Sequence, residues 1–424
     1  MITSTSASHS ALLRLATLDP HAPVAIVRDG TDTLILHDCE EIITANGADA
    51  LVALAAMQRS SGVWAGALNY QLGATIEPRS TRHLSRHATS CSPNDDRGFN
   101  DLVFARFAKV ERFRPTDQTI AADRCYSSPP LAPLGVMQSN MSEVTHAASV
   151  ATIREYLADG DCYQVNLTRR LTSPTRPNPR ALYTAIARTH SAPHAMLLHL
   201  AGSAHHELAI VSASPEQFIR VDGRRITTAP IKGTARDAPR LTRSTKDRAE
   251  HVMIVDLARN DLGRVCAYGS VRVPNLATTE CHPGLAHLVS SVHGVLRPEV
   301  GMREIIQATF PAASITGAPK PRVLEIISEL ETVRRDYYCG AVGWIDADRG
   351  ICDLSVAIRT FTISAHGTDF GVGGGIVWDS EARAEWAETE LKAHRLLQIA
   401  GGYESSVPAP QSMTANATTT GVRA

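Results

Sequence analysis

A lysine occupies an unusual position in the segment "PIKGT", between an apolar pair and a glycine turn. Lysine side chains normally lie on the solvated surface, so Lys232 is either a surface residue or a chemical group. Sixteen residues earlier, "SPEQF" places Glu216 on what we expect to be a neighbouring strand. A carboxyl group facing a lysine can be an acid and nucleophile pair or an ordinary salt bridge. Both interpretations stay open at this point, and both residues are candidate catalytic residues.

Two predicted helices each carry two acidic residues three positions apart, so each pair lies on one helix face. The pairs are Asp247 with Glu250 and Glu385 with Glu388. Carboxylates without histidine or thiolate neighbours are typical of a magnesium site, because this ion uses few protein ligands and keeps several waters. A solvated helix face, with an ion pair between Glu388 and Lys392, is the simpler interpretation of the helix pattern alone.

Two backbone segments are suited to binding an anion. "GVGGGIVWD" places Gly373, Gly374 and Gly375 in a strand-like context, where bare N–H groups can approach a carboxylate. "SITGAPK" runs through Thr316 and Gly317 into a predicted helix, and the start of a helix favours anions. Glycine bulges and capped helices are common, so neither segment identifies a ligand by itself.

The elements that must position these residues alternate along the chain between residues 137 and 402. Short segments bounded by turns predict strands at 194–200, 206–213, 217–223 and 224–231. Longer capped segments predict helices at 139–161, closed at Gly160, at 244–263, capped by Ser244, and at 379–402, stopped by Gly401 and Gly402. The sequence has no internal repeat and no GxGxxG or P-loop motif. It therefore predicts a large mixed sheet system with several helices.

Three polar or proline-rich segments divide the chain. Residues 79–100 predict an exposed loop, 126–136 a linker and 403–424 a disordered tail. We therefore expect an N-terminal region at 1–125 and a catalytic domain at 137–402.

Composition excludes several classes of protein. The 424 residues suffice for two ordinary domains or one large one. With 42 basic and 43 acidic side chains and few aromatic ones, a nucleic-acid or membrane-surface partner is not indicated. The eight cysteines form no CxxC pair or Cys/His cluster, which argues against a disulfide framework and a zinc site. Apolar runs stay below the roughly 18 residues of a membrane span, and the start "MITSTSASHSALLRLATLDP" lacks a signal-peptide pattern. We expect a cytoplasmic protein.

Nine motifs follow one another in unbroken order over residues 150 to 402. They are "GDCYQVNLTRR", "SPEQF", "PIKGT", "DRAEHVMIVDLARNDLGRV", "HLVSSVHG", "SITGAPK", "AIRTFTI", "GGGIVWDS" and "AEWAETELK". Together they resemble the chorismate-utilising enzymes, which include anthranilate synthase component I, aminodeoxychorismate synthase component I, and the isochorismate and salicylate synthases. The resemblance implies an α/β fold, a two-lobed sandwich of mainly antiparallel sheets packed face to face with helices outside. It also implies that the N-terminal region is interleaved with a chorismate-binding core.

Two positions separate the chemistries within this family. Enzymes that add water carry a lysine base where this sequence has Gln164, so Gln164 resembles the ammonia-using branch. Anthranilate synthases have a small residue where this sequence has Lys232, so the lysine resembles the aminodeoxychorismate synthase component I branch. That branch converts chorismate and ammonia to 4-amino-4-deoxychorismate for 4-aminobenzoate and folate biosynthesis. Anthranilate synthase component I and, more distantly, a water-using isochorismate enzyme are the alternatives. A non-catalytic chorismate-binding module would be expected to have lost Glu216 or a metal carboxylate, and all are present.

The resemblance implies a role for each candidate residue. Lys232 would attack C2 of chorismate while Glu216 acts as general acid on the leaving 4-hydroxyl. Glu250 and Glu388 would hold Mg²⁺ against the ring carboxylate, with Asp247 and Glu385 as the outer pair. The remaining substrate-binding residues would be Thr316, Gly373, Gly374, Gly375 and Lys392 at that carboxylate, Arg359 at the enolpyruvyl carboxylate, His287 along the ring, and Trp344 where the family usually has tyrosine in a "GxxGY" stretch.

The resemblance also implies a partner. The sequence has no nucleophile-elbow cysteine of the kind that glutaminase domains carry, so ammonia would come from a separate glutamine amidotransferase subunit, component II. The N-terminal region lacks the leucine-rich stretch from which family members build a tryptophan site, so tryptophan binding is not carried over.

Overall fold

The computed structural model describes residues 9–78, 97–115, 130–190, 192–202, 207–235, 245–282 and 285–405. Side chains are described for these residues except 234–235, 245–247, 281–282 and 285–287. Most of the predicted loop at 79–100, part of the predicted linker, nearly all of the predicted tail and the predicted cap Ser244 therefore lie outside the described residues.

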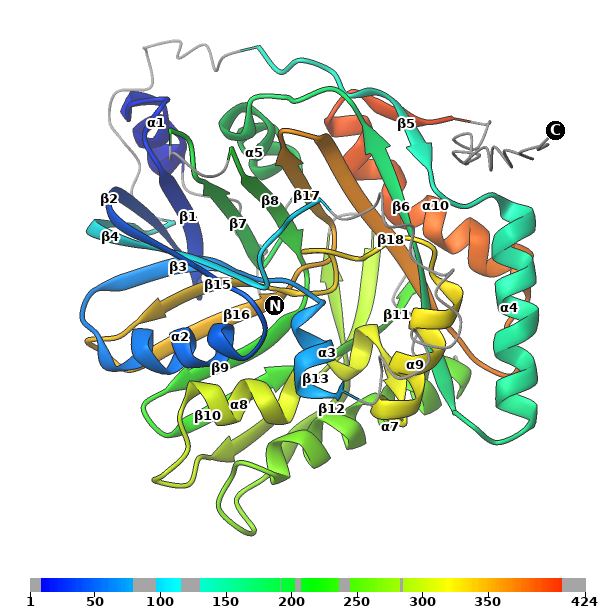
Figure 1. Cartoon of the computed structure of the whole chain (residues 1–424). Coiled ribbons are helices and arrows are strands. Elements are labelled where there is room, and N and C mark those ends of the chain that lie inside the picture. Colours follow the sequence, from blue (N-terminus) through cyan, green and yellow to red (C-terminus); the bar gives the residue numbers. More distant parts are fainter. Residues whose placement is uncertain are drawn as a thin grey trace, which may run out of the picture.

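Hydrogen-bonded strands form one long, mainly antiparallel succession that folds back on itself (Figure 1). The first half contains, in pairing order, β12 (Arg272–His282), β13 (Leu285–Val295), β10 (Arg225–Ala229), β9 (Gln217–Asp222), β16 (Ile351–Val356), β15 (Ala341–Asp346) and β3 (Val63–Leu68). The second half contains β1 (Val24–Asp29), β7 (His194–His199), β8 (Ala209–Ser214), β17 (Thr360–Ser364), β18 (Gly367–Ile376), β6 (Gln164–Ser173) and β5 (Gly135–Ser139). The long strands β2 (Asp32–Ala45) and β4 (Leu102–Phe113) pair with each other and join the two halves.

Three short strands complete the arrangement. β11 (Ile231–Ala235) pairs with β13 beside β10, and β14 (Gly317–Ala318) pairs with β6. β19 (Gly402–Glu404) pairs with β5 in parallel, unlike the other pairs described. The predicted strand at 224–231 is thus two strands, because β10 ends at Ala229 and Pro230 separates it from β11. Proline has no N–H to continue a ladder, so Lys232 belongs to a separate short strand.

Apolar side chains fill the space between the two halves. Side chains of β1, β2, β7 and β8 pack there against those of β3, β15 and β16, with Leu198 and Trp344 among the buried members. Two further clusters lie beneath helices on the outer faces. α2 (Gly47–Arg59), α7 (Thr245–Gly263) and α8 (Met302–Thr309) cover the first half, and α1 (His9–Thr17), α5 (Pro179–Thr189) and α10 (Ala382–Ile399) cover the second. Sheets packed face to face with helices outside confirm the expected fold.

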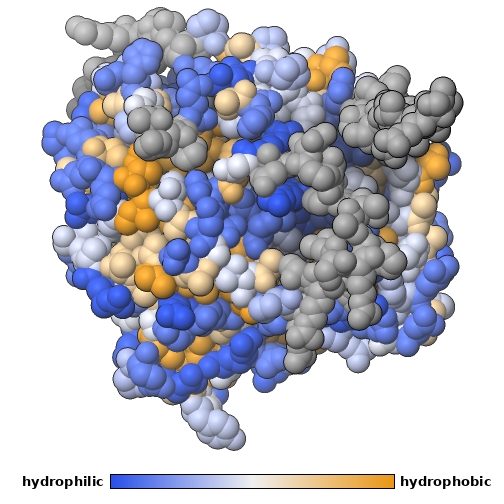
Figure 2. All heavy atoms as spheres, in the orientation of Figure 1, coloured by the Kyte–Doolittle hydropathy of each residue, from blue (hydrophilic) through white to orange (hydrophobic). Residues whose placement is uncertain are grey.

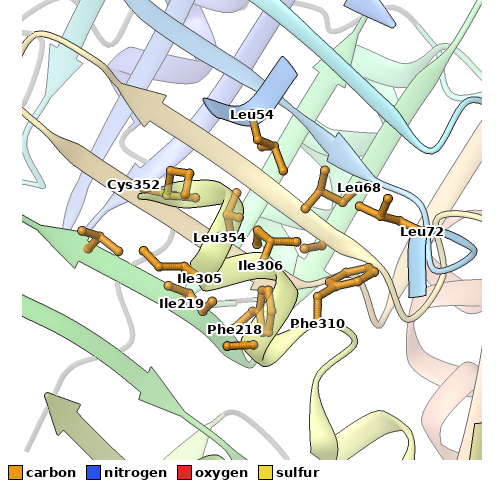
Figure 3. Packing of buried hydrophobic residues seen from close by; sticks show 14 of the residues in the cluster. Leu54, Leu68, Leu72, Phe218, Ile219, Ile305, Ile306, Phe310, Cys352 and Leu354 are labelled. Atoms are coloured by element: carbon orange, nitrogen blue, oxygen red, sulfur yellow. The ribbon is translucent and has the colours of Figure 1, made fainter. Parts of the chain in front are cut away.

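Figure 3 shows the cluster beneath α8. Ile305 and Ile306 of this helix point toward Phe218, Ile219 and Leu354 of the strands below, and all five are buried. Burying a side chain of this size contributes about 1.5–3 kcal/mol. The cluster therefore fixes α8 and the segment that follows it, η3 (Ala313–Ile315), against β9.

The remaining helices are α3 (Leu72–Ile76), α4 (Glu143–Ala158) and α9 (Lys320–Leu330), and the last two pack around one end of β6. α4 begins later than predicted because residues up to Ser139 belong to β5. Ser142 caps it, accepting a hydrogen bond from Thr145 N–H.

Strands from the N-terminal region lie inside the same sheet as later ones. β1 pairs with β7 and β3 pairs with β15, while the domain boundaries at 125, 136 and 402 stay predictions. On the face in Figure 2, hydrophobic residues form separate areas among hydrophilic ones. None of the helices in the described residues is long and apolar enough to cross a membrane.

Candidate active site

A cavity of about 210 Å³ lies where β11 and α7 face β18 and α10. It collects residues that are far apart in the sequence. The predicted residues in its lining are Glu216, Lys232, Glu250, Arg359, Gly373, Gly375, Glu385, Glu388 and Lys392. The fold therefore brings nine of the fifteen predicted site residues to one place.

Lys232 enters the cavity from β11. Its backbone pairs with Leu288 of β13, and the register shifts at Gly233, whose φ of +67° suits glycine. Protein surrounds the Lys232 side chain, but the side chain faces the cavity and is therefore partly accessible to solvent. Burial is the largest influence on the pKa of Lys232 and lowers it. Glu250 opposes this effect and Lys392 adds to it, so the net result is a larger share of neutral amine, the nucleophilic form.

Glu216 sits at the corner between β8 and β9 with 4% of its surface exposed. The corner is fixed, because Glu216 N–H donates to Ser214 Oγ at 3.2 Å and Val356 N–H donates to Glu216 O at 3.0 Å. Burial raises the pKa of Glu216 to about 7, against the opposing effects of the Ser314 hydroxyl, Lys232 and the Ile231 backbone. A carboxylic acid that keeps its proton near neutral pH can act as a general acid.

Two helices bring acidic residues to the cavity. α7 packs on β11 and β13 and carries Glu250, while α10 packs on β18 and carries Glu385 and Glu388. Glu385 is buried and accepts a hydrogen bond from Ser380 Oγ at 2.6 Å. Glu388 Oε1 lies 2.7 Å from Lys392 Nζ, so the ion pair considered in the simpler interpretation is present. Both of its members also line the cavity, so the ion pair and a binding role coexist.

These carboxylates fit a magnesium ion and not a centre built wholly from protein ligands. Within the described residues, no three His, Cys, Asp or Glu side chains are close enough to hold a metal ion together. Glu250, Glu385 and Glu388 nevertheless line one cavity. Mg²⁺ commonly uses one or two carboxylates and fills its other positions with water and substrate oxygens. The side chain of Asp247, the fourth predicted ligand, lies outside the described residues.

The glycines of β18 make room for neighbouring side chains. A Cβ on Gly375 would lie 2.8 Å from Gln164 Nε2 and 3.2 Å from Lys232 Nζ, so both nitrogens flank this glycine. A Cβ on Gly374 would lie 3.4 Å from Glu385 Oε2. None of the three glycines has a left-handed φ, so the lack of space for a side chain, and not the backbone conformation, accounts for glycine at these positions.

Gln164 lies behind Gly375 and does not line the cavity directly. It is fully buried, and neither atom of its side-chain amide makes a hydrogen bond to another described residue. Leaving a buried amide unsatisfied costs about 1–3 kcal/mol, and such groups in native proteins often have a functional reason. Its position beside the Lys232 amine makes it a candidate partner for a small polar molecule.

Two cations face the cavity besides Lys232. Arg359 lies between β16 and β17 with a φ of +53°, a left-handed conformation that is uncommon for arginine and recurs at functional sites. Burial lowers the pKa of Arg359 to about 10, so its guanidinium is still charged at neutral pH. Lys392 Nζ donates to Gly373 O at 2.8 Å. Two anchored cations in one cavity suit a substrate with more than one carboxylate.

Trp344 corrects the sequence interpretation, because it lies in the interior between the sheet halves. It is 2% exposed, its Nε1–H donates to Arg28 O at 3.1 Å, and it is absent from the cavity lining.

Thr316 is also outside the lining: it is fully buried, and its hydroxyl donates to Ala312 O at 3.0 Å. The hydroxyl therefore holds the turn beside the cavity. His287 belongs to β13, and its side chain lies outside the described residues.

Three residues near the cavity were missed by sequence reasoning. Tyr338 lines it, and its ring packs so closely on Gly371 that a Cβ there would lie 2.2 Å from the ring. The doublet "YYCG", six residues before Trp344, was the available signal. Ser314 lines the cavity beside Glu216, and His251 is fully buried next to Glu250 in sequence, with Nε2 2.6 Å from Ser290 Oγ. No periodicity distinguishes these two from core residues.

Comparison with known proteins identifies the family of the chain. Residues 18–398 match the family described as chorismate binding enzyme. The chain belongs to the chorismate-binding enzyme family.

Its curated relatives carry two names. The chain is 42% identical over 272 residues to aminodeoxychorismate synthase component 1 of Escherichia coli, an alignment that covers 62% of this chain and 58% of that protein. It is 37% identical over 324 residues to an anthranilate synthase component 1 of Haloarcula marismortui, covering 73% of this chain and 62% of that protein. The chain thus spans about three fifths of the length of these relatives.

A solved structure shows the same fold. The anthranilate synthase component I of Streptococcus pneumoniae superposes with a TM-score of 0.71 at 25% identity, covering 90% of this chain and 93% of that one.

Proposed function

We propose that this chain is the component I of an aminodeoxychorismate synthase, which converts chorismate and ammonia to 4-amino-4-deoxychorismate. The observation that carries the proposal is the pairing of Lys232 and Glu216 in one cavity, each with its pKa displaced toward the reactive form. Relatives named aminodeoxychorismate synthase component 1 match at 39–42% identity, and an anthranilate synthase component 1 matches at 39%. Identity does not separate the two activities, so Lys232 distinguishes them in this proposal.

Chorismate fits the charges of the cavity. Arg359 would bind one of its two carboxylates, and the other would lie among Lys392, the glycines of β18 and the acidic residues. Glu250 and Glu388, with Glu385 nearby, would hold a magnesium ion. Its positive charge would offset the negative charges of the second substrate carboxylate and of these acidic residues. Without a cation, carboxylates of substrate and protein would repel one another at this position.

The proposed reaction has two displacements at the ring. In the first, the neutral Lys232 amine forms a bond to C2, both ring double bonds shift by one position, and the C4–O bond breaks. Glu216 gives its proton to the departing hydroxyl, which leaves as water. In the second, ammonia forms a bond to C4, both ring double bonds shift back, and the C2–N bond to Lys232 breaks. The incoming nitrogen keeps its surplus proton, so the net change is chorismate, ammonia and the proton from Glu216 to the ammonium form of 4-amino-4-deoxychorismate plus water.

Gln164 would help to select ammonia over water. Its amide oxygen can accept a hydrogen bond from ammonia, and a neutral amide cannot deprotonate water as the lysine of water-using family members would. The ammonia would be supplied by a separate glutamine amidotransferase subunit, consistent with the component names of the relatives.

Product analysis tests the proposal. Purified protein is incubated with chorismate, Mg²⁺ and an ammonium salt, and products are separated by chromatography and identified by mass. We expect the 4-amino isomer, and we expect its loss when Mg²⁺ is removed with a chelator. Anthranilate as the main product would overturn the assignment in favour of the alternative activity, and isochorismate would favour the water-using one.

A further inference from the structure

Glu216 has a second cavity on its other side. This smaller cavity, of about 30 Å³, is enclosed by α7, α8, η3 and the strands β9 and β10. Glu216 and Ser314 are the two residues that line both it and the large cavity. A substrate in the large cavity would cover one face of the Glu216 carboxyl, whereas the small cavity reaches the group from behind.

The small cavity leads from Glu216 to a partly buried ion pair. Asp261 of α7 and Thr309 of α8 form part of its wall. Lys320 Nζ donates to Asp261 Oδ2 at 2.8 Å and to Thr309 O at 3.0 Å. The side chains of Asp261 and Lys320 are 16% and 14% exposed, so this end of the cavity reaches solvent.

Ser314 supplies a polar group to a small cavity whose other walls are largely apolar. The residue is 7% exposed, and its buried hydroxyl interacts with the Glu216 carboxyl but meets no partner at full hydrogen-bond geometry among the described residues. Thr309 donates its hydroxyl to Ile305 O at 2.8 Å, which leaves its oxygen lone pairs available. A space of this size holds one or two waters when two or more polar groups surround it.

We propose that this small cavity is a water-filled proton path, in which Ser314 and Asp261 connect Glu216 to solvent. The path restores the proton that Glu216 gives to the departing hydroxyl. The inference rests on the proposed use of Glu216 as general acid, and it assigns Asp261 and Ser314 as positioning residues for proton delivery.

The proton balance requires that Glu216 regain a proton after each turnover. In the first displacement the Glu216 proton leaves in the water molecule. An aliphatic amine holds a proton near neutral pH, so the 4-amino product leaves as an ammonium ion and keeps the surplus proton of the incoming nitrogen. Glu216 then remains ionised until a proton arrives from solvent. A water in the small cavity gives its proton to Glu216 and takes another from Asp261 or from solvent, which restores the neutral acid.

The charges around the two ends favour this direction. Near Asp261 lie Lys320 and Arg264, which lower its pKa, and Glu77, which raises it, and burial leaves the net pKa raised. Asp261 therefore takes up a proton more readily than a surface aspartate. Near Glu216 the described charged neighbour is Lys232, whose effect on the pKa is smaller than that of burial.

The experiment compares Asp261→Asn and Ser314→Ala with Asp256→Asn. Asp256 is on the same helix but exposed, where it pairs with Arg259, so its variant controls for a lost α7 carboxylate. Chorismate consumption is followed in the full-length protein, in H₂O and in D₂O. General acid–base groups contribute about 10²–10⁴-fold, so we expect each relay variant to lose at least about tenfold in kcat. We also expect a larger solvent isotope effect, an unchanged KM for chorismate, and recovery of rate as imidazole buffer is added as an external acid.

The outcomes separate this inference from the proposed function. Chorismate consumption is measured whichever product forms. An anthranilate product would refute the proposed function, but the rates, isotope effects and buffer recovery would still test the proton path. Rates and isotope effects equal to those of Asp256→Asn in both variants would overturn the relay. A loss of rate that buffer does not restore, with no change in the isotope effect, would show a structural role and overturn it too. Should Asp261→Asn fail to fold, Ser314→Ala decides by the same measurements.

Discussion

Burial shifts the pKa values of Lys232 and Glu216 in opposite directions, and both shifts suit the proposed reaction. Removing a charged group from water disfavours its charged form, so an amine loses its proton more easily and a carboxyl keeps it longer. Burial lowers the pKa of Lys232 and raises that of Glu216 to about 7. Burial thus increases the share of neutral amine at Lys232 and of protonated carboxyl at Glu216, the two forms that the proposed first displacement uses.

Replacing Lys232 should remove the covalent step. We expect Lys232→Ala to make little or no 4-amino-4-deoxychorismate at wild-type ammonia concentrations, while traces of the 2-amino isomer or anthranilate appear because ammonia can reach C2. Intact-protein mass spectrometry after incubation with chorismate and Mg²⁺, without ammonia, should show an adduct on the wild type.

The matched control is Lys109→Ala, which removes an exposed lysine of β4. It should form the adduct and turn over like the wild type. Formation of the 4-amino product by Lys232→Ala at the wild-type rate would make Lys232 an ordinary lysine.

Glu216 should also make stability depend on pH. Its folded-state pKa of about 7 lies above the ordinary value of 4.5, so its contribution to stability is fully present below pH 4.5 and is lost as pH rises through 7. A shift of this size corresponds to roughly 3 kcal/mol at 1.36 kcal/mol per pKa unit. We expect Glu216→Gln to be more stable than the wild type at pH 8, with the difference disappearing toward pH 4.5.

Urea unfolding of both proteins across this range measures the effect. Glu143→Gln, a change at an exposed position at the start of α4, serves as the control and should follow the wild type. Parallel stability curves for wild type and Glu216→Gln would contradict the raised pKa.

At the scale of elements, β18 determines how closely α10, β6 and β11 approach one another. The glycines of β18 have no side chains, and this leaves room beside the strand for Gln164, Lys232 and the α10 carboxylates. The strand pairs with β6 along nearly its whole length, from Thr368 to Ile376, and this pairing fixes its position. We therefore expect side-chain volume on this strand to affect activity as well as packing.

Gly375→Ala should impair catalysis more than folding. The new Cβ would meet the mobile ends of Gln164 and Lys232, which can move aside, so the fold survives while the reactive groups shift. A displacement of about 1 Å can cost about 100-fold in rate. We expect a loss of that order in kcat/KM with a small change in Tm.

Two other glycines give the comparison. In Gly343→Ala the Cβ would lie 2.0 Å from the backbone oxygen of Asp353, and we expect a loss of about 3 kcal/mol or more in stability. Gly263→Ala meets no atom within 4 Å and should change neither property. Full activity of Gly375→Ala would show that its neighbours do not need their observed positions.

The whole molecule places its chemistry where elements from both halves of the sheet meet. β11 and α7 belong with the first half, and β18 and α10 with the second, so neither half alone contains the complete site. The N-terminal strands β1 to β4 connect the halves. Loss of this region is therefore expected to disturb the site without removing any of its residues.

The chain should use ammonia but not glutamine when it is alone. We propose that glutamine hydrolysis belongs to a separate subunit, so product should form with ammonium salts and should not form with glutamine. Adding a glutaminase subunit of an aminodeoxychorismate synthase should restore glutamine use. Ammonia-dependent turnover of the same preparation is the control, and release of glutamate from glutamine by the pure chain would contradict the two-subunit arrangement.

Much of the site could be predicted from the sequence because its chemistry depends on residue types that are seldom buried in a protein interior. The lysine in "PIKGT", the paired carboxylates and the glycine run indicated six of the residues that line the cavity, and Glu216, Arg359 and Lys392 are the other three predicted residues there. The alternation of short and long apolar segments likewise indicated a sheet with helices, since these periods depend only on local geometry.

The tertiary structure decided what local pattern cannot encode, namely which face of each element meets which neighbour. Trp344 and Tyr338 are aromatic residues of the same segment, yet the first packs between the sheet halves and the second lines the cavity. Ser314 and Asp261 have no distinguishing spacing, and only the packing of η3, α7 and α8 places them behind Glu216. Burial, which displaces the pKa values of Lys232 and Glu216, is a sum over atoms from distant parts of the chain, so it exists only once the chain has folded.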